Sequence, residues 1–369
     1  MKIQLVDLKA QYRSIKAEID TAIQGVIDES AFIKGKYVTA FENEYAESYG
    51  VKHCVSCANG TDAIYIALKA LGIGVGDEVI TTALTWISTA EAITQTGARV
   101  VFVDIEPTYY AIDARRIEDK VTPRTKAIIP VHLYGHPANM DAIMSIAEKH
   151  GLYVVEDCAQ AHFAQWKGQN VGTFGVAGTF SFFPSKNLGA YGDAGCIVSN
   201  DDGFSVRARM FANHGSVVKH QHDTEGINSR MDGIQAAILS VKLRHVGEWN
   251  KLRIMHAKRY NELLCDVVLT PSNHPEARHV FHLYVVRTEK RDDLRKRLEA
   301  NDIATGVHYP TALPFLKAYA HLGHEPRDFS VAHTCSSQIV SLPMYPELTD
   351  ETQDVVVQAI RGADAIYSP

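Results

Sequence analysis

The feature that most constrains the fold is a regular alternation of short apolar runs with segments of helical length. Most of the runs are apolar throughout, rather than on alternate residues. Strands of this kind, joined by helical crossovers, form a largely parallel sheet that helices cover on both faces. We expect strands at EVITTA 78–83, RVVFVDI 99–105, KAIIPVHLYG 126–135, LYVVED 152–157, TFSFF 179–183 and CIVSN 196–200, with helices such as DAIYIALKAL 62–71 and MDAIMSIAEKH 140–150 between them.

The two ends of the chain follow other patterns. Apolar residues at helical spacing predict an amphipathic helix over 11–29, and a second helix after Gly35 is expected to end at Gly50. A long helix is predicted over 231–264. Beyond it we expect strands at HVFHLYVVRT 279–288 and near GVHYP 306–310, and helices at DDLRKRLEAND 292–302 and after Thr349. The sequence therefore predicts an α/β fold with a large N-terminal domain, residues 1–250, and a smaller α+β domain, residues 251–369.

Composition excludes several classes of protein. The chain has 369 residues and a formal net charge of −6, without the basic patch of a nucleic-acid-binding protein. No run of eighteen apolar residues occurs, so we expect no membrane span. The charged N-terminal residues do not resemble a signal peptide, and a cytoplasmic location is expected. Cys54 and Cys57 form a CxxC without a second ligand pair, so buried reduced thiols and no metal site are predicted.

Three polar features lie where a parallel sheet places its ligand site, at the carboxyl ends of strands. Lys186 follows an apolar strand by three residues, although burying an ammonium costs several kcal/mol. Asp157 ends another strand, and Asn59-Gly60-Thr61 opens a helix whose free N–H groups can bind a phosphate. An amine nucleophile, a carboxylate for a ring nitrogen and a phosphate loop together indicate pyridoxal phosphate (PLP).

Seven longer stretches make the assignment more specific. With them the chain resembles the DegT/StrS family of PLP-dependent nucleotide-sugar aminotransferases, of PLP fold type I, over essentially its whole length. The resemblance implies a large PLP-binding domain with a mostly parallel mixed sheet. The stretches are FIKGKYVTAFENEYA, ANGTDAIYIAL, GDEVITTALTWISTAEAI, VEDCAQAH, SFFPSKNLGAYGDAG, INSRMDGIQAAIL and GVHYP.

The resemblance also implies roles for individual residues. Lys186 would attach the cofactor covalently, and Asp157 would bind its pyridine nitrogen. Gln160 would lie near the ring oxygen, and Trp86 would stack on the ring. The phosphate would contact Gly60, Thr61, Ser181 and, from the second subunit, Asn228, which implies an obligate homodimer with sites at the interface. From the residues alone, Asn228 would instead be an N-cap of the following helix.

The reaction implied is transfer of the amino group of glutamate to a nucleotide-linked keto-sugar, in amino-sugar and polysaccharide biosynthesis such as that of lipopolysaccharide O-antigen. Relatives that dehydrate their substrate carry histidine at the position of Lys186. The form FFPSKNLGAYGDAG is similar to the subgroup that aminates C3 of a keto-hexose. A 4-keto substrate is the alternative, and the carrier, dTDP or UDP, is left open.

Other polar residues are candidates for the substrate pocket. A polar segment holds His214, Lys219, His220, His222 and Arg230, which would meet the diphosphate or form a solvated loop. His308 and Tyr309 would line the sugar pocket by resemblance.

Two rival functions and one departure from the family pattern remain. A non-catalytic regulatory protein could keep the fold and the cofactor, and a lyase acting on an amino acid could use Arg230 as its carboxylate clamp. Phe163 stands where the family usually has glycine, which is expected to narrow the pocket or displace the next strand.

Overall fold

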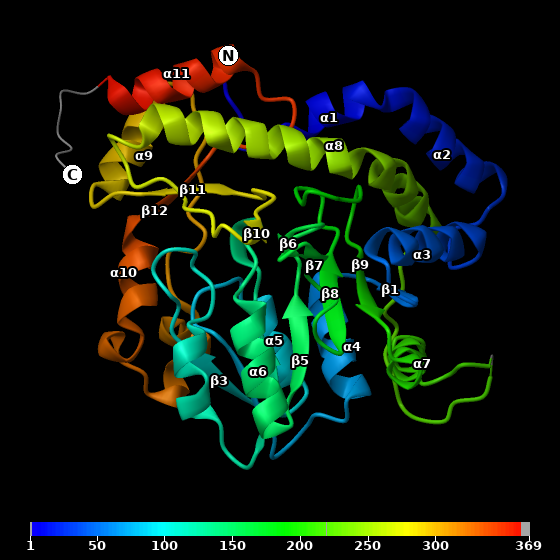
Figure 1. Cartoon of the computed structure of the whole chain (residues 1–369). Coiled ribbons are helices and arrows are strands. Elements are labelled where there is room, and N and C mark those ends of the chain that lie inside the picture. The colour runs from blue at the N-terminus through cyan, green and yellow to red at the C-terminus, as the bar shows by residue number, and fades with distance from the viewer. Residues whose placement is uncertain (1, 219, 363–369) are drawn as a thin grey trace.

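A seven-stranded mixed sheet forms the centre of the computed structural model, which describes residues 2–218 and 220–362 (Figure 1). Only β9 runs antiparallel to its neighbours, β1 and β8, and every other pairing is parallel. The predicted largely parallel sheet is therefore confirmed. In spatial order the strands are β1 His53–Cys57, β9 Gly195–Ser199, β8 Ala177–Ser181, β5 Tyr153–Asp157, β4 Thr125–Ile129, β2 Glu78–Thr82 and β3 Arg99–Val103.

Alternate residues of these strands enter different cores, because successive side chains point to opposite faces of a sheet. In β4, Ala127 and Ile129 pack into the core shared with α4, α5 and α7, whereas Ile128 packs against α6. Both faces are thus covered, which explains strands that are apolar throughout. The helices are α4 Gly60–Ala70, α5 Ser88–Gln95, α6 Met140–His150 and α7 Asp202–Phe211.

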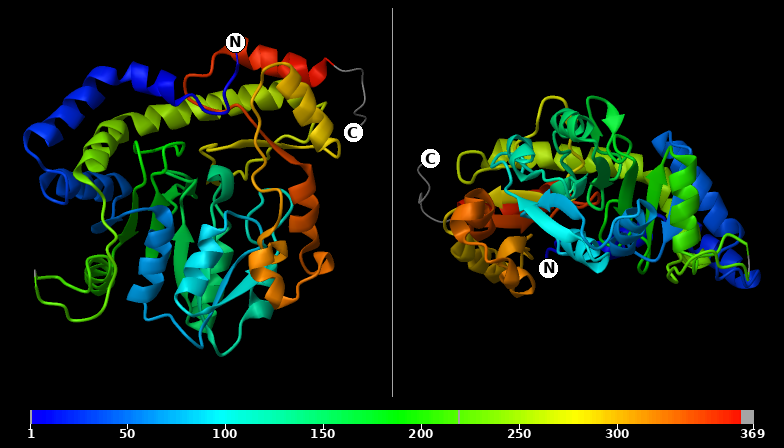
Figure 2. Two further views of the ribbon diagram at one scale, coloured as in Figure 1. Left: turned by 180° about the vertical axis from the view of Figure 1, so that it is seen from behind. Right: turned by 90° about the horizontal axis from the view of Figure 1, so that it is seen from below.

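A layer of helices crosses one end of the sheet (Figures 1 and 2). The 32-residue helix α8, Gly233–Leu264, packs against α2 and α3 near its start and against α11 near its end. The helix predicted over 11–29 is wrong in one respect, because Ile15, with a φ of −125°, divides it into two. The other helices of this layer are α1 Leu8–Ser14, α2 Lys16–Asp28, α3 Lys36–Tyr49, which ends at Gly50 as predicted, and α11 Asp350–Arg361.

The C-terminal part is built on a two-stranded sheet, β11 Tyr284–Arg287 with β12 Ile339–Leu342. The strand predicted over 279–288 is shorter because Val280 and Leu283 donate backbone hydrogen bonds to the segment after β4. No strand forms at GVHYP, where only Gly306 pairs, with Ser341. The remaining elements are β6 Gln165–Trp166, β7 Gln169–Asn170, β10 Ala277–Arg278, α9 Arg291–Ala300, α10 Ser330–Gln338 and the short 3₁₀ helices η1 Ala114–Arg116, η2 Glu118–Lys120, η3 Leu133–Gly135, η4 Leu313–Phe315, η5 Lys317–Leu322 and η6 Pro326–Phe329.

The division into residues 1–250 and 251–369 stays a prediction. Helix α8 carries the chain continuously across residue 250, and the core beneath its second half also contains Ile3 from the N-terminus. Among the described residues, no helix is long and apolar enough to cross a membrane. Cys54 and Cys57 are buried and free, as predicted.

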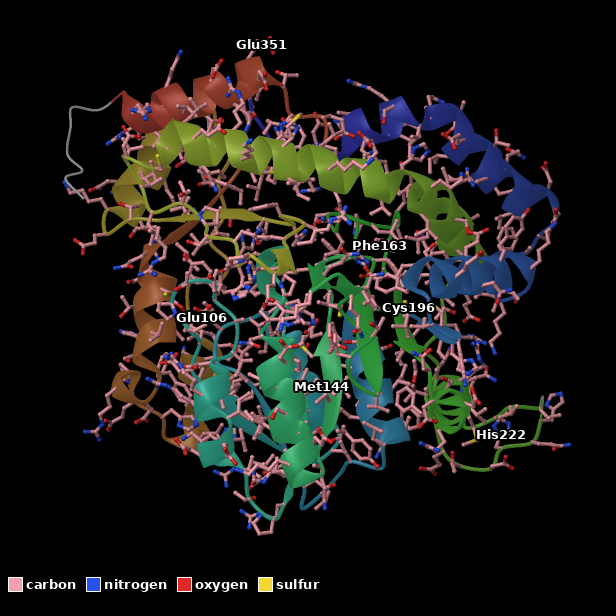
Figure 3. All side chains as sticks on the ribbon, viewed as in Figure 1. Glu106, Met144, Phe163, Cys196, His222 and Glu351 are labelled. Atoms are coloured by element: carbon pink, nitrogen blue, oxygen red, sulfur yellow. The ribbon has the colours of Figure 1, made fainter. Side chains whose placement is uncertain are left out.

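Phe163 lies in the layer between the sheet and α8, not in the site cavity (Figure 3). Its φ of +62° is in the left-handed region that favours glycine, which explains why a glycine would suit this position. Its N–H donates to the Tyr49 hydroxyl at 2.7 Å, and its ring lies 4.6 Å from the Tyr49 ring. The expected narrowing of the pocket is therefore wrong, since aromatic packing holds the ring elsewhere.

Replacing Phe163 should reveal whether backbone strain or ring packing has the larger effect on stability. Phe163→Gly relieves about 1 kcal/mol of backbone strain but loses ring packing that stabilises the fold by more, so thermal unfolding should occur several degrees lower. Phe163→Tyr keeps the ring and serves as the control. A higher midpoint of thermal unfolding for Phe163→Gly than for the wild type would show that the ring packing does not outweigh the backbone strain.

Candidate active site

A cavity of about 460 Å³ opens at the carboxyl ends of β5 and β8. This is where a ligand site is expected in such a sheet. Nine of the predicted site residues line it, from both the central sheet and the C-terminal part. They are Gly60, Thr61, Trp86, Asp157, Gln160, Ser181, Lys186, His308 and Tyr309.

Lys186 lies in the turn after β8, where its backbone N–H donates to the Phe183 carbonyl at 2.8 Å. Burial lowers the pKa of Lys186 to about 8, and the nearby Asp157 carboxylate partly offsets this. At pH 7 a lysine with this pKa is neutral in roughly a tenth of the molecules, far more often than an ordinary lysine. It is therefore a competent nucleophile toward a carbonyl carbon.

Asp157, the last residue of β5, is 5% exposed, so its carboxylate needs hydrogen-bond partners. Thr89 donates its hydroxyl to one carboxylate oxygen at 2.7 Å, and the N–H of Ala159 donates to the other at 3.1 Å. These donors fix the carboxylate at the cavity wall, where it can accept a hydrogen bond from a bound ring.

The N-terminus of α4 forms a second wall. Asn59 caps the helix by accepting from the N–H of Asp62 at 2.8 Å, and the Thr61 hydroxyl bonds that of Ser88 at 2.7 Å. A Cβ on Gly60 would lie 2.6 Å from the Ser181 Cβ, so only glycine lets the helix approach β8 this closely. Helix N–H groups and hydroxyls gathered in this way suit a phosphate.

The far wall comes from the C-terminal part. Gln160 donates to the Tyr309 hydroxyl at 3.0 Å and accepts from the N–H of Tyr134 at 2.7 Å. The Tyr309 ring lies 5.5 Å from that of Trp86, which is 57% exposed. Burial and the positive charge of Lys186 lower the pKa of His308 to about 4, so its imidazole is neutral at neutral pH.

The remaining predicted residues lie outside this cavity in the single chain. His214, His220, His222 and Asn228 are exposed on or near the loop after α7, which extends away from the body of the molecule (Figure 3). Arg230 lines a separate cavity of about 120 Å³ beside Lys34, and Lys219 lies outside the described residues. Asn228 is not the N-cap of α8: it pairs with Asn213, and Asp232 occupies the cap.

Several lining residues carried no signal in the sequence. Thr89 and Ser88 begin α5, and a hydroxyl at a helix start is usually a cap. Leu5 and Val6 reach the cavity from the N-terminal segment because Ile3 pairs with Ile303. A family alignment could mark these positions, but no local pattern does.

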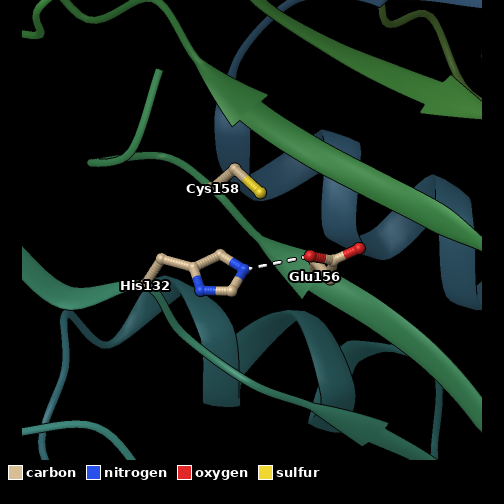
Figure 4. A group of neighbouring side chains, drawn as sticks. All are labelled: His132, Glu156 and Cys158. Carbon is tan, nitrogen blue, oxygen red and sulfur yellow. Dashed lines mark hydrogen bonds and ion pairs between the residues drawn. The ribbon is translucent and has the colours of Figure 1, made fainter. Parts of the chain in front are cut away.

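His132, Glu156 and Cys158 lie close enough together to hold a metal ion, but their contacts indicate a structural role (Figure 4). The Nδ1 of His132 accepts from the N–H of Ala138, so its Nε2 carries the proton and donates to Glu156 at 3.1 Å. The Glu156 carboxylate accepts three further backbone N–H bonds, at 2.7–2.9 Å. Burial and nearby carboxylates raise the pKa of the Cys158 thiol, which disfavours the thiolate that a metal needs.

The cavity fits PLP by its own chemistry. It combines a lysine with a lowered pKa, a fixed carboxylate near it and a helix start that only glycine at position 60 lets approach Ser181 this closely. Fold and site thus define a PLP-dependent enzyme of fold type I.

Residues 13–361 match the DegT/DnrJ/EryC1/StrS aminotransferase family, and the chain belongs to this family, whose cofactor is PLP. It is 47% identical to the pleiotropic regulatory protein of Geobacillus stearothermophilus, over 98% of both chains. It is 45% identical to the UDP-N-acetyl-3-dehydro-alpha-D-glucosamine 3-aminotransferase of Acidithiobacillus ferrooxidans, over 97% of both chains. The crystal structure of DesV from S. venezuelae superimposes with a TM-score of 0.96, at 40% identity and 98% coverage of both chains.

The close approach of α4 to β8 yields a prediction. Gly60→Ala should weaken PLP binding at least about tenfold, because the new Cβ must push the helix start away from Ser181. Titration of the apoprotein with PLP, followed by absorbance, measures the change.

Gly203→Ala is the matched control. Gly203 also lies in the first turn of a helix, α7, but its added Cβ would meet only side-chain atoms, at 3.3 and 3.5 Å. Equal PLP affinity of Gly60→Ala and the wild type would show that the start of α4 is not where the phosphate binds.

Proposed function

We propose that the chain transfers the amino group of glutamate, through PLP, to a nucleotide-linked 3-keto-hexose. The observation that carries this proposal is that Lys186, Asp157 and the start of α4 line one cavity. An aminotransferase needs these three elements together, and the fold brings them from three separate segments.

Each residue has a defined task. Bound PLP supplies an electron sink for the electron pair left when a Cα–H bond breaks. Lys186 would attach the cofactor and, once displaced, its Nζ would take the proton from Cα of the amino donor and deliver it to C4′ of the cofactor. Asp157, oriented by Thr89, would accept the hydrogen bond of the ring nitrogen and keep that nitrogen protonated. Ser181 and the start of α4 would hold the phosphate.

The sugar position rests on two supports. The residues around Lys186 are similar to the subgroup that aminates C3, and the relative from Acidithiobacillus ferrooxidans is named as a 3-aminotransferase of a UDP-linked sugar. The neutral His308 and the Tyr309 hydroxyl supply hydrogen-bonding groups for sugar hydroxyls at the far wall. We leave the carrier as UDP or dTDP, and place the enzyme in the cytoplasm, in amino-sugar and polysaccharide synthesis such as that of O-antigen.

The homodimer is part of the proposal. Asn228, His214, His220 and His222 are exposed, Arg230 lines a separate cavity, and none of the five lines the cavity of Lys186 in its own chain. We propose that these residues act in the partner's site. There Asn228 would contact the phosphate of PLP, and the cationic side chains would contact the diphosphate of the sugar nucleotide.

A regulatory protein is the second candidate, because the relative from Geobacillus stearothermophilus carries that name. Against it, the described chain retains a nucleophilic lysine with a lowered pKa and a carboxylate fixed by two donors. Both groups are ones that proton transfer on bound PLP uses.

The substrate is tested most cleanly in reverse. With 2-oxoglutarate as amino acceptor, 3-amino sugars linked to UDP or dTDP should form glutamate at least about tenfold faster than the 4-amino compounds. Glutamate release measures the rate. Preference for a 4-amino sugar would overturn the C3 assignment, and inactivity with every compound despite bound PLP would favour the regulatory role.

The interface is tested by mixing two inactive variants. Asn228→Asp would place a negative charge against the phosphate in the partner's site, and Lys186→Ala removes the nucleophile. In a hybrid dimer one site then carries both lesions and the other carries neither, so about a quarter of the activity should return on random exchange.

Exchange is verified by mixing Lys186→Ala with a tagged wild-type chain and recovering both in one dimer. No recovery of activity after verified exchange would place Asn228 in its own subunit's site.

A further inference from the structure

A lysine buried within α8 contacts the loop that carries Lys186. The Nζ of Lys242 donates to the Gly189 carbonyl at 2.7 Å and lies 4.2 Å from the centroid of the Tyr191 ring. Lys242 is fully buried. Since burying an ammonium costs several kcal/mol and apolar replacements are often as stable, such a lysine calls for a reason other than stability.

The contacted loop folds back on itself around Lys186. A Cβ on Gly189 would lie 2.4 Å from the Pro184 carbonyl oxygen and 2.8 Å from that of Phe183. The N–H of Lys186 donates to the same Phe183 carbonyl. The position of Gly189 therefore fixes the turn from which the Lys186 side chain leaves the backbone.

Two other residues of α8 hold the same loop, directly beneath the helix in Figure 1. Gln235 accepts from the N–H of Tyr191 at 2.9 Å, and Asn250 accepts from the Asn187 amide at 2.7 Å. Lys242 stands between them, at spacings of about two helical turns, so the three side chains lie along one face of α8. Within the described chain, only Lys242 donates a hydrogen bond to the Gly189 carbonyl.

The contact does not depend on the charge of Lys242. Burial lowers its pKa to about 7, against the attraction of Glu347. A neutral amine retains N–H donors, so the bond to Gly189 persists in both protonation states.

We propose that Lys242 is a positioning residue for Lys186: its hydrogen bond to Gly189 fixes the turn that aims the Lys186 amine into the cavity and shields it from water. The inference rests on the proposed role of Lys186. Lys242 itself does not line the cavity.

The test compares Lys242→Met with Lys251→Met, a change on the same helix at an exposed lysine that bonds Glu248. Competitive acylation of the apoprotein over a range of pH, read by mass spectrometry of the Lys186 peptide, reports the pKa of Lys186. In Lys242→Met it should rise by about one pH unit toward the ordinary value, because water reaches a loosened turn. In Lys251→Met it should not change.

Stability and kinetics separate positioning from a purely structural role. Lys242→Met should unfold within about 3 °C of the wild type, since methionine fills a similar volume without a buried charge. In the holoenzyme kcat should fall about tenfold with KM changed less than about threefold. Lys242→Arg, which restores a donor, should bring the acylation profile back toward the wild type.

An unchanged Lys186 profile in Lys242→Met would overturn the inference, as would an equal shift in Lys251→Met. A large loss of thermal stability in Lys242→Met would also overturn it, by making the lysine a structural residue. These outcomes are distinct from failure of the proposed function, which would appear as PLP attached to a lysine other than Lys186.

Discussion

The site depends on the parallel pairing of β5 with β8. Their register, with Asp157 opposite Thr179, ends both strands at one edge of the sheet, so that the carboxylate and the turn holding Lys186 face a common cavity. The start of α4 reaches the same edge because Gly60 tolerates close contact with Ser181. Every proposed chemical role follows from this convergence, and the C-terminal part then closes the cavity with His308 and Tyr309.

The sequence predicted those parts of the fold and the site that have a local pattern. Strands that are apolar throughout indicated a covered parallel sheet, and polar residues at two strand ends and one helix start marked the lysine, the carboxylate and the phosphate loop. The sequence did not predict Thr89 or Leu5, because their contacts join segments far apart in the chain without a local pattern. The strand expected at GVHYP did not form: only Gly306 pairs, with Ser341, and His308 and Tyr309 line the cavity instead.

Polar groups that look costly in isolation have two different explanations. Glu156 is buried with a full set of donors, and it ties β5 to the segment after β7 as a structural anchor. Lys242 has one hydrogen bond and a lowered pKa, and its carbonyl partner lies three residues from Lys186. The contacts of Glu156 stabilise the fold, whereas the proposed role of the Lys242 contact is to position Lys186.

The central claim is that Lys186 carries the cofactor, and borohydride reduction of the purified holoprotein tests it most directly. Reduction should fix PLP to the protein and abolish its visible absorbance band. Peptide mapping by mass spectrometry should then place the label on the peptide containing Lys186, at about one label per subunit. The Lys186→Ala variant should carry no covalent label after reduction. Label on another lysine, or a purified protein that takes up no PLP, would contradict the account.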